Sequence, residues 1–246
     1  VHLRHLWGRD GLVDLFSTAA GLESMVIGER EIAGQMRRAA RTAWEDGTLS
    51  CDLGRAAERA SATSRRVATE TGLAGAGRSV VAVGLDMAAA HLGPWEDARV
   101  LIVGTGAYAG ATVSALHALG ASDVSVYSTS GRAREFAQGR GIGWVDAADL
   151  PSALEHADLV VTCRGLGSPV LTRDMAAQAG HTVVLDLALM RDTESSVASL
   201  PNVTLIDLPT IQASVPAADA DALTRARNII DEEVSSFERG LGARSM

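Results

Sequence analysis

The stretch Ala98-Arg-Val-Leu-Ile-Val-Gly-Thr-Gly-Ala-Tyr-Ala-Gly-Ala-Thr-Val-Ser-Ala-Leu-His-Ala-Leu119 decides the fold. Its apolar run at 100–103 ends at Gly104, small residues follow, and an apolar pattern of helical period continues to Leu119. A short apolar run closed by glycine is typical of a buried parallel strand, and the pattern behind it is typical of a helix. The stretch therefore predicts a strand, a tight turn and the start of a helix, in that order.

The turn has the spacing G-x-G-x-x-A, a permitted variant of the dinucleotide-binding pattern. Amides at a helix N-terminus carry partial positive charge and attract phosphate, and glycine lets the backbone approach it closely. Glycine-rich turns also join strands to helices for structural reasons alone. We expect the pyrophosphate of a dinucleotide at six positions: Gly104, Thr105, Gly106, Ala107, Tyr108 and Ala109.

The end of the second expected strand, Tyr127, indicates which dinucleotide binds. Sites for NAD usually place Asp or Glu here to hold the ribose 2′-hydroxyl. In this chain Ser-Thr-Ser130-Gly-Arg132 follows, with no acid. Hydroxyls and a guanidinium suit a 2′-phosphate, so Ser130 and Arg132 favour NADPH over NADH. In the alternative interpretation, Ser130 caps the next helix and Arg132 lies in solvent.

From Arg99 onward, strand and helix patterns alternate. The expected strands are 99–103, 123–127, 144–146, 158–163, 182–187 and 204–207, and the expected helices are 107–119, 131–138, 149–155, 172–178 and 194–199. Such alternation predicts an α/β fold with a Rossmann-type, doubly wound parallel sheet. Ligands of such sheets bind outside the carboxyl ends of the strands.

The flanking segments have helical patterns. Apolar spacing predicts helices at about 12–19, 29–44, 52–70 and 79–91, and a trailing helix at about 217–239. We therefore expect three parts: a mostly helical domain at 1–92, a Rossmann domain at 93–212, and the start of a connecting helix at 213–246.

The charged residues exclude several functions. The formal net charge is −8, and all 22 basic residues are arginine. Without lysine, a Schiff base and the phosphate-loop lysine of nucleotide hydrolases are excluded. The net charge argues against broad nucleic-acid binding. Segment 30–78 carries nine arginines against six acids, which fits a solvated helix surface or a local contact to an acidic partner such as RNA.

The two cysteines, Cys51 and Cys163, lie far apart in different sequence contexts. They suggest neither a disulfide framework nor a metal site, and no apolar run reaches membrane-spanning length. We expect a cytoplasmic protein with no metal ion and no membrane segment.

The junction at 21–35 combines polar residues with glycines. Glu31 and Gln35 are four residues apart and share one helical face. Helix capping explains Glu29, since acids favour the first turn, but it explains neither Gly28 nor Gln35. A packed helix junction and a small-molecule site both remain open.

Four runs of the chain form a larger pattern: Leu15-Phe16-Ser-Thr-Ala-Ala-Gly-Leu-Glu-Ser-Met-Val-Ile-Gly-Glu-Arg-Glu-Ile-Ala-Gly-Gln35, Arg66-Val-Ala-Thr-Glu-Thr-Gly-Leu73, Asp186-Leu-Ala-Leu-Met-Arg-Asp192, and the last helix through Glu232, Glu233 and Phe237. Together with the strand–turn–helix at 100–119, they resemble the motifs of the glutamyl-tRNA reductases of tetrapyrrole biosynthesis. The resemblance spans nearly the whole chain, in the order of the family.

This resemblance implies NADPH-dependent reduction of glutamyl-tRNA(Glu) to glutamate-1-semialdehyde, the first step toward 5-aminolevulinate and porphyrins. A cysteine thiolate forms a thioester and releases tRNA, and hydride from NADPH then reduces the thioester. The resemblance also implies a homodimer and a partnership with glutamate-1-semialdehyde aminomutase. By motif, five residues fall at substrate-contacting positions: Ser24, Glu29, Arg30, Glu31 and Gln35.

Two departures from the family bear on the chemistry. The nucleophilic cysteine belongs to a Ser-Thr-Cys-Asn-Arg-like motif upstream of the signature, and this motif does not occur here. The histidine that precedes Leu15-Phe16 in the family is replaced by Asp14, which cannot provide a neutral imidazole. We therefore expect a partial catalytic domain that lacks the nucleophile segment, followed by a NADP domain and only the beginning of the dimerisation domain. On its own, this polypeptide is not expected to form the thioester.

Two other functions are considered. A shikimate dehydrogenase-like reductase of a small carbonyl compound would need a lysine–aspartate pair, which a chain without lysine cannot provide. A non-catalytic NADP-binding sensor would account for Asp14 and for the missing cysteine motif.

Overall fold

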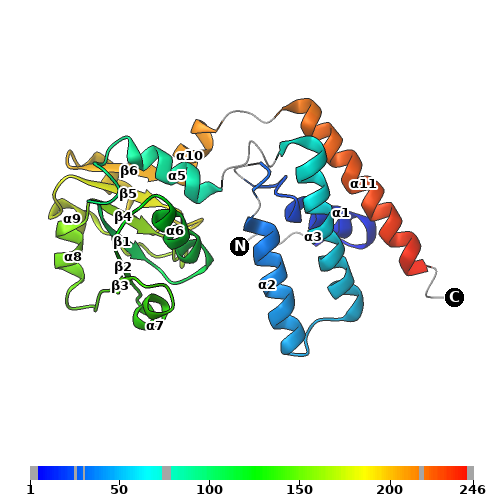
Figure 1. Ribbon diagram of the computed structural model, residues 1–246, viewed down its shortest axis with the longest axis horizontal. Helices are drawn as coiled ribbons and strands as arrows, with labels where there is room; N and C mark the ends of the chain where they lie inside the picture. Colours follow the sequence, from blue (N-terminus) through cyan, green and yellow to red (C-terminus); the bar gives the residue numbers. More distant parts are fainter. Residues whose placement is uncertain (1–4, 25–26, 30, 74–78, 216–218, 243–246) are drawn as a thin grey trace. The chain divides into compact units, whose positions relative to one another are not determined.

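The computed structural model describes residues 5–24, 27–29, 31–73, 79–215 and 219–242 (Figure 1). The chain divides into two compact units. One unit combines Val1–Ser79 with Pro216–Met246, and the other is Val80–Val215. Each unit has its own core and is described separately.

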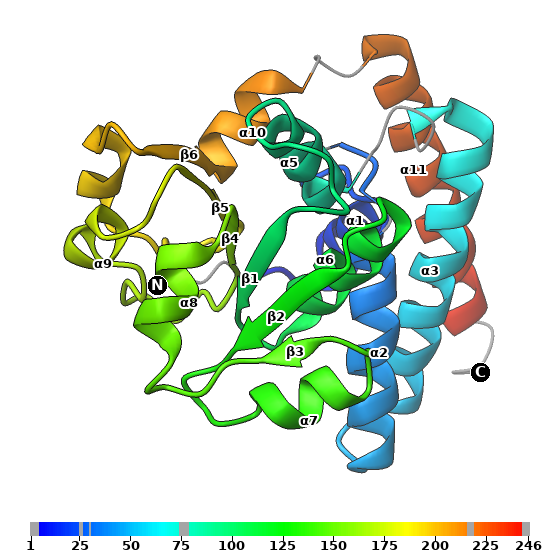
Figure 2. The same cartoon turned by 60° about the vertical axis from the view of Figure 1, so that its left-hand side comes forward.

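The second unit contains a six-stranded parallel sheet in the order β3-β2-β1-β4-β5-β6. The strands are β1 (Arg99–Val103), β2 (Asp123–Tyr127), β3 (Gly143–Trp144), β4 (Leu159–Thr162), β5 (Thr182–Asp186) and β6 (Val203–Asp207). Figure 2 shows β1, β2 and β3 side by side. The order reverses between β1 and β4, so the predicted Rossmann-type sheet is confirmed.

Helices cover both faces of this sheet. They are α5 (Val80–Ala89), α6 (Ala107–Ala118), α7 (Ala133–Gln138), α8 (Leu150–His156), α9 (Arg173–Ala177), the 3-10 helix η1 (Ser195–Ser199) and α10 (Leu208–Ser214). Leu101 and Val184 pack in one core with α8, α9 and η1. Leu185, adjacent to Val184, faces the opposite side, where it meets α5.

The sequence patterns missed one helix of this unit. Asp207 ends β6, and its carboxylate accepts a hydrogen bond from the Thr210 backbone N–H at 3.0 Å. Pro209 falls in the first turn of α10, where the missing N–H of proline costs nothing. Asp-x-Pro is thus a helix start that apolar periodicity alone does not identify.

The boundary between the units lies before α5, whereas the sequence analysis placed it at 92. Gly84 of α5 lies so close to β5 that a Cβ there would be 2.7 Å from Leu185 Cδ1. Val81, Leu85 and Ala88 are also buried. The periodicity at 79–91 predicted the helix, but it carries no information about which unit the helix packs against.

The first unit is helical. Its elements are α1 (Gly8–Ala19), α2 (Glu31–Glu45), α3 (Cys51–Thr71) and α11 (Ala220–Gly242). Phe16, Val67, Ile230 and Val234 form its buried core, and the Phe16 and Phe237 rings meet edge-on at 6.2 Å. The helix expected to trail the chain is therefore an integral part of this core. Among the described residues, no helix is long and apolar enough to cross a membrane.

Candidate functional site

The turn after β1 lies between the ends of two neighbouring strands. Gly104 has φ +133°, and its N–H donates to the Tyr127 carbonyl at 2.9 Å. On the other side, a Cβ at Gly104 would lie 3.0 Å from Cys163 Sγ. A side chain is therefore excluded both by the positive φ and by β4, so this glycine is required by the turn itself.

The second glycine of the turn has open space around it in the described part of the chain. Gly106 is the N-cap of α6 with φ −84°, and no side chain caps the helix there. No heavy atom of the described residues would lie within 4 Å of a Cβ at this position. Ala109, the third residue of α6, is fully buried. The open, positively polarised helix start fits a pyrophosphate.

Ser130 and Arg132 come together at the end of β2. Arg132 Nε donates to Ser130 Oγ at 3.0 Å, and the Ser130 and Ser128 hydroxyls are 2.9 Å apart. The N-cap of α7 is Arg132, and no side chain caps this helix. Ser130 therefore does not cap α7, which removes the alternative interpretation of this residue. The exposed Ser130 hydroxyl and Arg132 guanidinium can donate hydrogen bonds to a phosphate.

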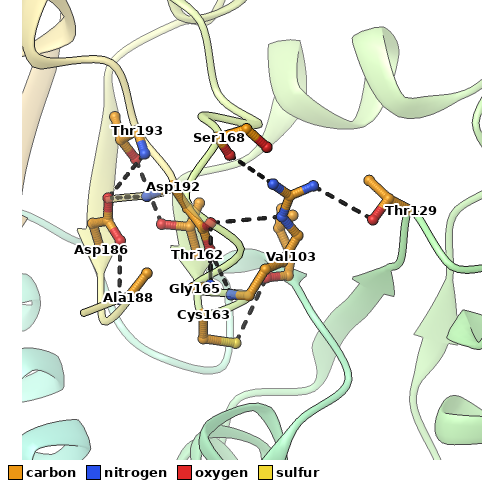
Figure 3. A network of polar contacts seen from close by, with 11 residues as sticks. Val103, Thr129, Thr162, Cys163, Gly165, Ser168, Asp186, Ala188, Asp192 and Thr193 are labelled. Carbon is orange, nitrogen blue, oxygen red and sulfur yellow. Dashed lines mark hydrogen bonds and ion pairs between the residues drawn. The ribbon is translucent and has the colours of Figure 1, made fainter. Parts of the chain in front are cut away.

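The loops after β4 and β5 are joined by buried carboxylates, which Figure 3 shows from close by. Asp192 is fully buried and accepts the backbone N–H groups of Arg164 and Gly165. Asp186 accepts the N–H groups of Asp192 at 3.0 Å and Thr193 at 2.9 Å. Burial raises the pKa of Asp186. The sequence patterns alone indicate no role for these residues, although both belong to the motif at 186–192.

Cys163, the last residue before that loop, is not an available nucleophile. Its Sγ is buried 3.6 Å from the Val103 carbonyl oxygen. Burial, and then the nearby Asp192 and Asp186 carboxylates, raise the pKa of the thiol to about 12. Since the thiolate is the reactive form, Cys163 is inert at neutral pH.

Apolar side chains mark the β4–β5 part of the same edge. Leu166, Leu189 and Met190 are all exposed, and Leu189 is 82% accessible. A Cβ at Gly167 would lie 2.7 Å from Met190 Cε, so the two loops touch. The carboxyl edge thus exposes polar side chains at β2 and, beyond the buried carboxylates, apolar side chains at β4 and β5, which suits a ligand with one phosphorylated and one aromatic end.

In the helical unit, the junction before α2 folds back tightly on itself. The Gly28 N–H donates to the Gly21 carbonyl at 3.0 Å. A Cβ at Gly21 would lie 2.7 Å from the Glu29 N atom, and one at Gly28 would lie 2.8 Å from the Leu73 carbonyl oxygen. Close backbone packing therefore explains both glycines. Glu29 is buried at this junction, at 3% exposure.

The remaining candidate residues of this unit are only partly described. Ser24, Gln35 and Asp14 are half-buried, with Asp14 on α1 and Gln35 on α2. Arg30 and the Glu31 side chain lie outside the described residues. The described residues contain no cluster of three or more His, Cys, Asp or Glu side chains that could hold a metal ion.

Comparison with known proteins gives consistent matches for both units. The family model "Glutamyl-tRNAGlu reductase, N-terminal domain" matches residues 1–71, and the model "Shikimate / quinate 5-dehydrogenase" matches residues 86–214. A glutamyl-tRNA reductase of Kocuria rhizophila is 44% identical over 94% of this chain and 53% of its own length. One of Cutibacterium acnes is 45% identical over 96% of this chain and 54% of its own length.

The solved structure of glutamyl-tRNA reductase from Methanopyrus kandleri also matches. It is 28% identical, with a TM-score of 0.52 over 95% of this chain and 61% of that chain. The chain thus spans about half the length of the curated relatives it matches.

Proposed function

This chain belongs to the glutamyl-tRNA reductase family, and we propose that it supplies the NADPH site and part of the substrate site of an enzyme reducing glutamyl-tRNA(Glu) to glutamate-1-semialdehyde. The observation that carries the proposal is the uncapped start of α6 beside the Ser130–Arg132 pair, in a chain of this family. The reaction is an oxidoreduction that forms an aldehyde and releases tRNA.

The residues of the carboxyl edge hold the cofactor in this proposal. The α6 amides and the turn from Gly104 to Ala109 bind the pyrophosphate, and Ser130 with Arg132 binds the 2′-phosphate. When bound, NADPH supplies the hydride. The apolar side chains of Leu189 and Met190 border the part of the edge where an aromatic ring would be shielded from water.

The substrate residues belong to the junction before α2. Ser24, Glu29, Arg30, Glu31 and Gln35 hold the glutamyl group by their place in the family motif. Among them, Arg30 has the charge to pair with the glutamate side-chain carboxylate. Asp14, at the position of the family histidine, orients a neighbouring group or accepts a proton.

Neither cysteine serves as the nucleophile in this proposal. Cys163 is buried with a raised pKa. Cys51 begins α3 and lines a groove with Trp44, near the C-terminal end of α2. A 15-residue helix is about 22 Å long, so Cys51 lies far from the junction at Glu31. We therefore propose that this polypeptide binds NADPH but does not form the thioester by itself.

The biological setting follows from the family. The product is consumed by glutamate-1-semialdehyde aminomutase on the way to 5-aminolevulinate, and the enzyme acts as a homodimer in the cytoplasm. These partners and this location are part of the proposal.

Two measurements test the proposed function. Fluorescence titration should show NADPH binding to this polypeptide about tenfold or more tightly than NADH, because one charge-assisted contact to the 2′-phosphate is worth at least that much. Absence of NADPH binding, or tighter binding of NADH, would contradict the proposal.

The second measurement follows semialdehyde formation from glutamyl-tRNA and NADPH. We expect none from this polypeptide alone, and turnover when a polypeptide carrying the upstream cysteine motif of the family is joined to it. No turnover in the joined protein would favour the NADP-binding sensor. Sustained turnover by the present polypeptide would refute the proposal that neither Cys51 nor Cys163 is the nucleophile.

A further inference from the structure

A buried guanidinium lies at the carboxyl edge without a full set of partners. Arg164 directly follows Cys163 at the end of β4, and its side chain is only 10% exposed. Its Nη2 donates to the Ser168 carbonyl at 2.7 Å. Its Nε is buried and has no hydrogen-bond acceptor among the residues that the structure describes. Unpaired buried donors are rare in folded proteins because their desolvation is uncompensated, so the hydrogen bonding of this guanidinium is incomplete.

The nearest carboxylate is shared between this guanidinium and the backbone. Asp192 Oδ1 lies 3.6 Å from Arg164 Nε, an ion pair that is beyond hydrogen-bond distance. The same carboxylate accepts the backbone N–H groups of Arg164 and Gly165. Asp186 in turn holds the Asp192 backbone N–H. These hydrogen bonds therefore hold the backbone at Arg164 in place. The guanidinium remains able to bind a further anion.

The guanidinium extends from β4 toward the end of β2. Arg164 Nη1 donates to Thr129 Oγ1 at 3.4 Å, a long hydrogen bond to a neutral hydroxyl. Thr129 lies between Ser128 and Ser130, in the loop where Arg132 binds the Ser130 hydroxyl. Arg164, which follows β4, and Arg132, which follows β2, thus both donate to hydroxyls of one loop.

We propose that Arg164 is a specificity-determining residue that binds the 2′-phosphate of NADPH together with Arg132. This inference rests on the proposed function. A phosphate oxygen would replace the long bond to Thr129 with a shorter, charge-assisted one. The pyrophosphate is the other candidate anion, but its ligands are the α6 amides, and the polar group nearest to Nη1 is in the β2 loop.

The test compares two coenzymes in matched variants. Arg164→Gln should weaken NADPH binding about 10- to 100-fold, the loss expected for one charge-assisted contact, and leave NADH binding unchanged. Arg164→Lys should lose less, because the charge is kept while the planar fork is lost. Arg173→Gln is the control: its Nη1 also donates to a backbone carbonyl at 2.7 Å, that of Ser196, and neither coenzyme should be affected.

Two fragments of the coenzyme, one with and one without the 2′-phosphate, test directly whether Arg164 contacts this phosphate. The affinity for 2′,5′-ADP should fall in Arg164→Gln, whereas that for 5′-AMP should not. Asp192 keeps its two backbone donors in this variant, so the fold is expected to survive, and a thermal melt checks this.

Three outcomes would overturn the proposal: an equal loss for NADPH and NADH, unchanged affinity for both, or a loss for NADPH that Arg173→Gln reproduces. An equal loss would assign Arg164 to the pyrophosphate or to the fold. If the unaltered protein failed to bind NADPH at all, the proposed function itself would fail, which is a distinguishable result.

Discussion

The guanidinium of Arg66 donates to the carboxylate of Glu233 at 3.0 Å, across 167 positions of the chain. Arg59, two helical turns earlier on α3, contacts the same carboxylate at 2.6 Å. Glu233 is only 16% exposed, so two arginines of α3 hold one largely buried acid of α11. This relationship joins the end of the sequence to its first third within one unit.

Loss of Arg66 should weaken the contact between α3 and α11 and so lower the stability of the helical unit. We expect Arg66→Ala to lower the melting temperature by about 2–4 °C, since it removes contacts to Glu70, Glu232 and Glu233 at once. The difference should shrink in 1 M NaCl, where the Debye length is about 3 Å. Arg65→Ala is the control, because Arg65 makes no side-chain ion pair among the described residues. Equal melting temperatures for the two variants would contradict a stabilising role of the Arg66 ion pairs.

Gly106 should be needed for the cofactor and not for the fold. Gly106→Val adds a side chain whose Cβ has no atom of the described residues within 4 Å, at an ordinary φ of −84°. The thermal melt should therefore change little, whereas NADPH affinity should fall at least about tenfold, because the added methyl groups occupy the approach of the pyrophosphate. Gly139→Val is the matched control, with similar open space among the described residues and a φ of −73°. Retained affinity in Gly106→Val would contradict the assigned phosphate site.

The two cysteines should differ sharply in reactivity. With its pKa raised to about 12 by burial, Cys163 is thiolate in about one molecule in 10,000 at pH 8. Cys51 is exposed. A disulfide reagent at pH 8 should therefore label one thiol per chain quickly, and Cys51→Ser should remove that phase. Both thiols should react in denaturant. Fast labelling of Cys163 in the folded protein would contradict the burial of its thiol.

Asp158 should make stability depend on acid pH. Hydrogen bonds from the Arg99 side chain at 2.9 and 3.0 Å, and from its backbone N–H at 2.8 Å, lower the pKa of this carboxyl against the opposing effect of burial. A lowered folded-state pKa contributes stability above the unfolded value of about 4, and this is lost as the pH falls through the folded value. Asp158→Asn should therefore melt earlier at pH 7.

The same variant should approach the unaltered protein as the pH is lowered below about 4. Asp97→Asn, at an exposed neighbouring carboxyl, should show no such convergence. A constant difference between Asp158→Asn and the unaltered protein from pH 7 to pH 3 would mean that the aspartate acts by packing and not by charge.

Much of the fold could be predicted from local patterns. Strands β1 and β2 have the predicted bounds, and α6 differs from its prediction by one residue. These elements follow from apolar runs closed by Gly104 and Tyr127, where strand period and turn chemistry agree. The helix after Asp207 was missed because its signal is a cap followed by proline and not a period.

Only those parts of the candidate site could be predicted whose residues lie close together in the sequence. The glycine turn and the Ser130–Arg132 pair are short motifs, and the structure brings each together. Their roles as ligands of a coenzyme stay predictions. Arg164 was not singled out, because its meaning depends on Thr129 and Asp192, which lie 35 and 28 positions away.

The sequence by itself determined the alternation of strand and helix, the glycine turn and the family motifs, because backbone sterics and apolar period act over a few residues. Only the tertiary structure decided that α5 packs on β5, that α11 completes the helical core, and that Cys163 is inert. Those properties depend on which distant residues exclude water from a given atom. Desolvation and burial are set by the whole packed unit, and no local run of residues specifies them.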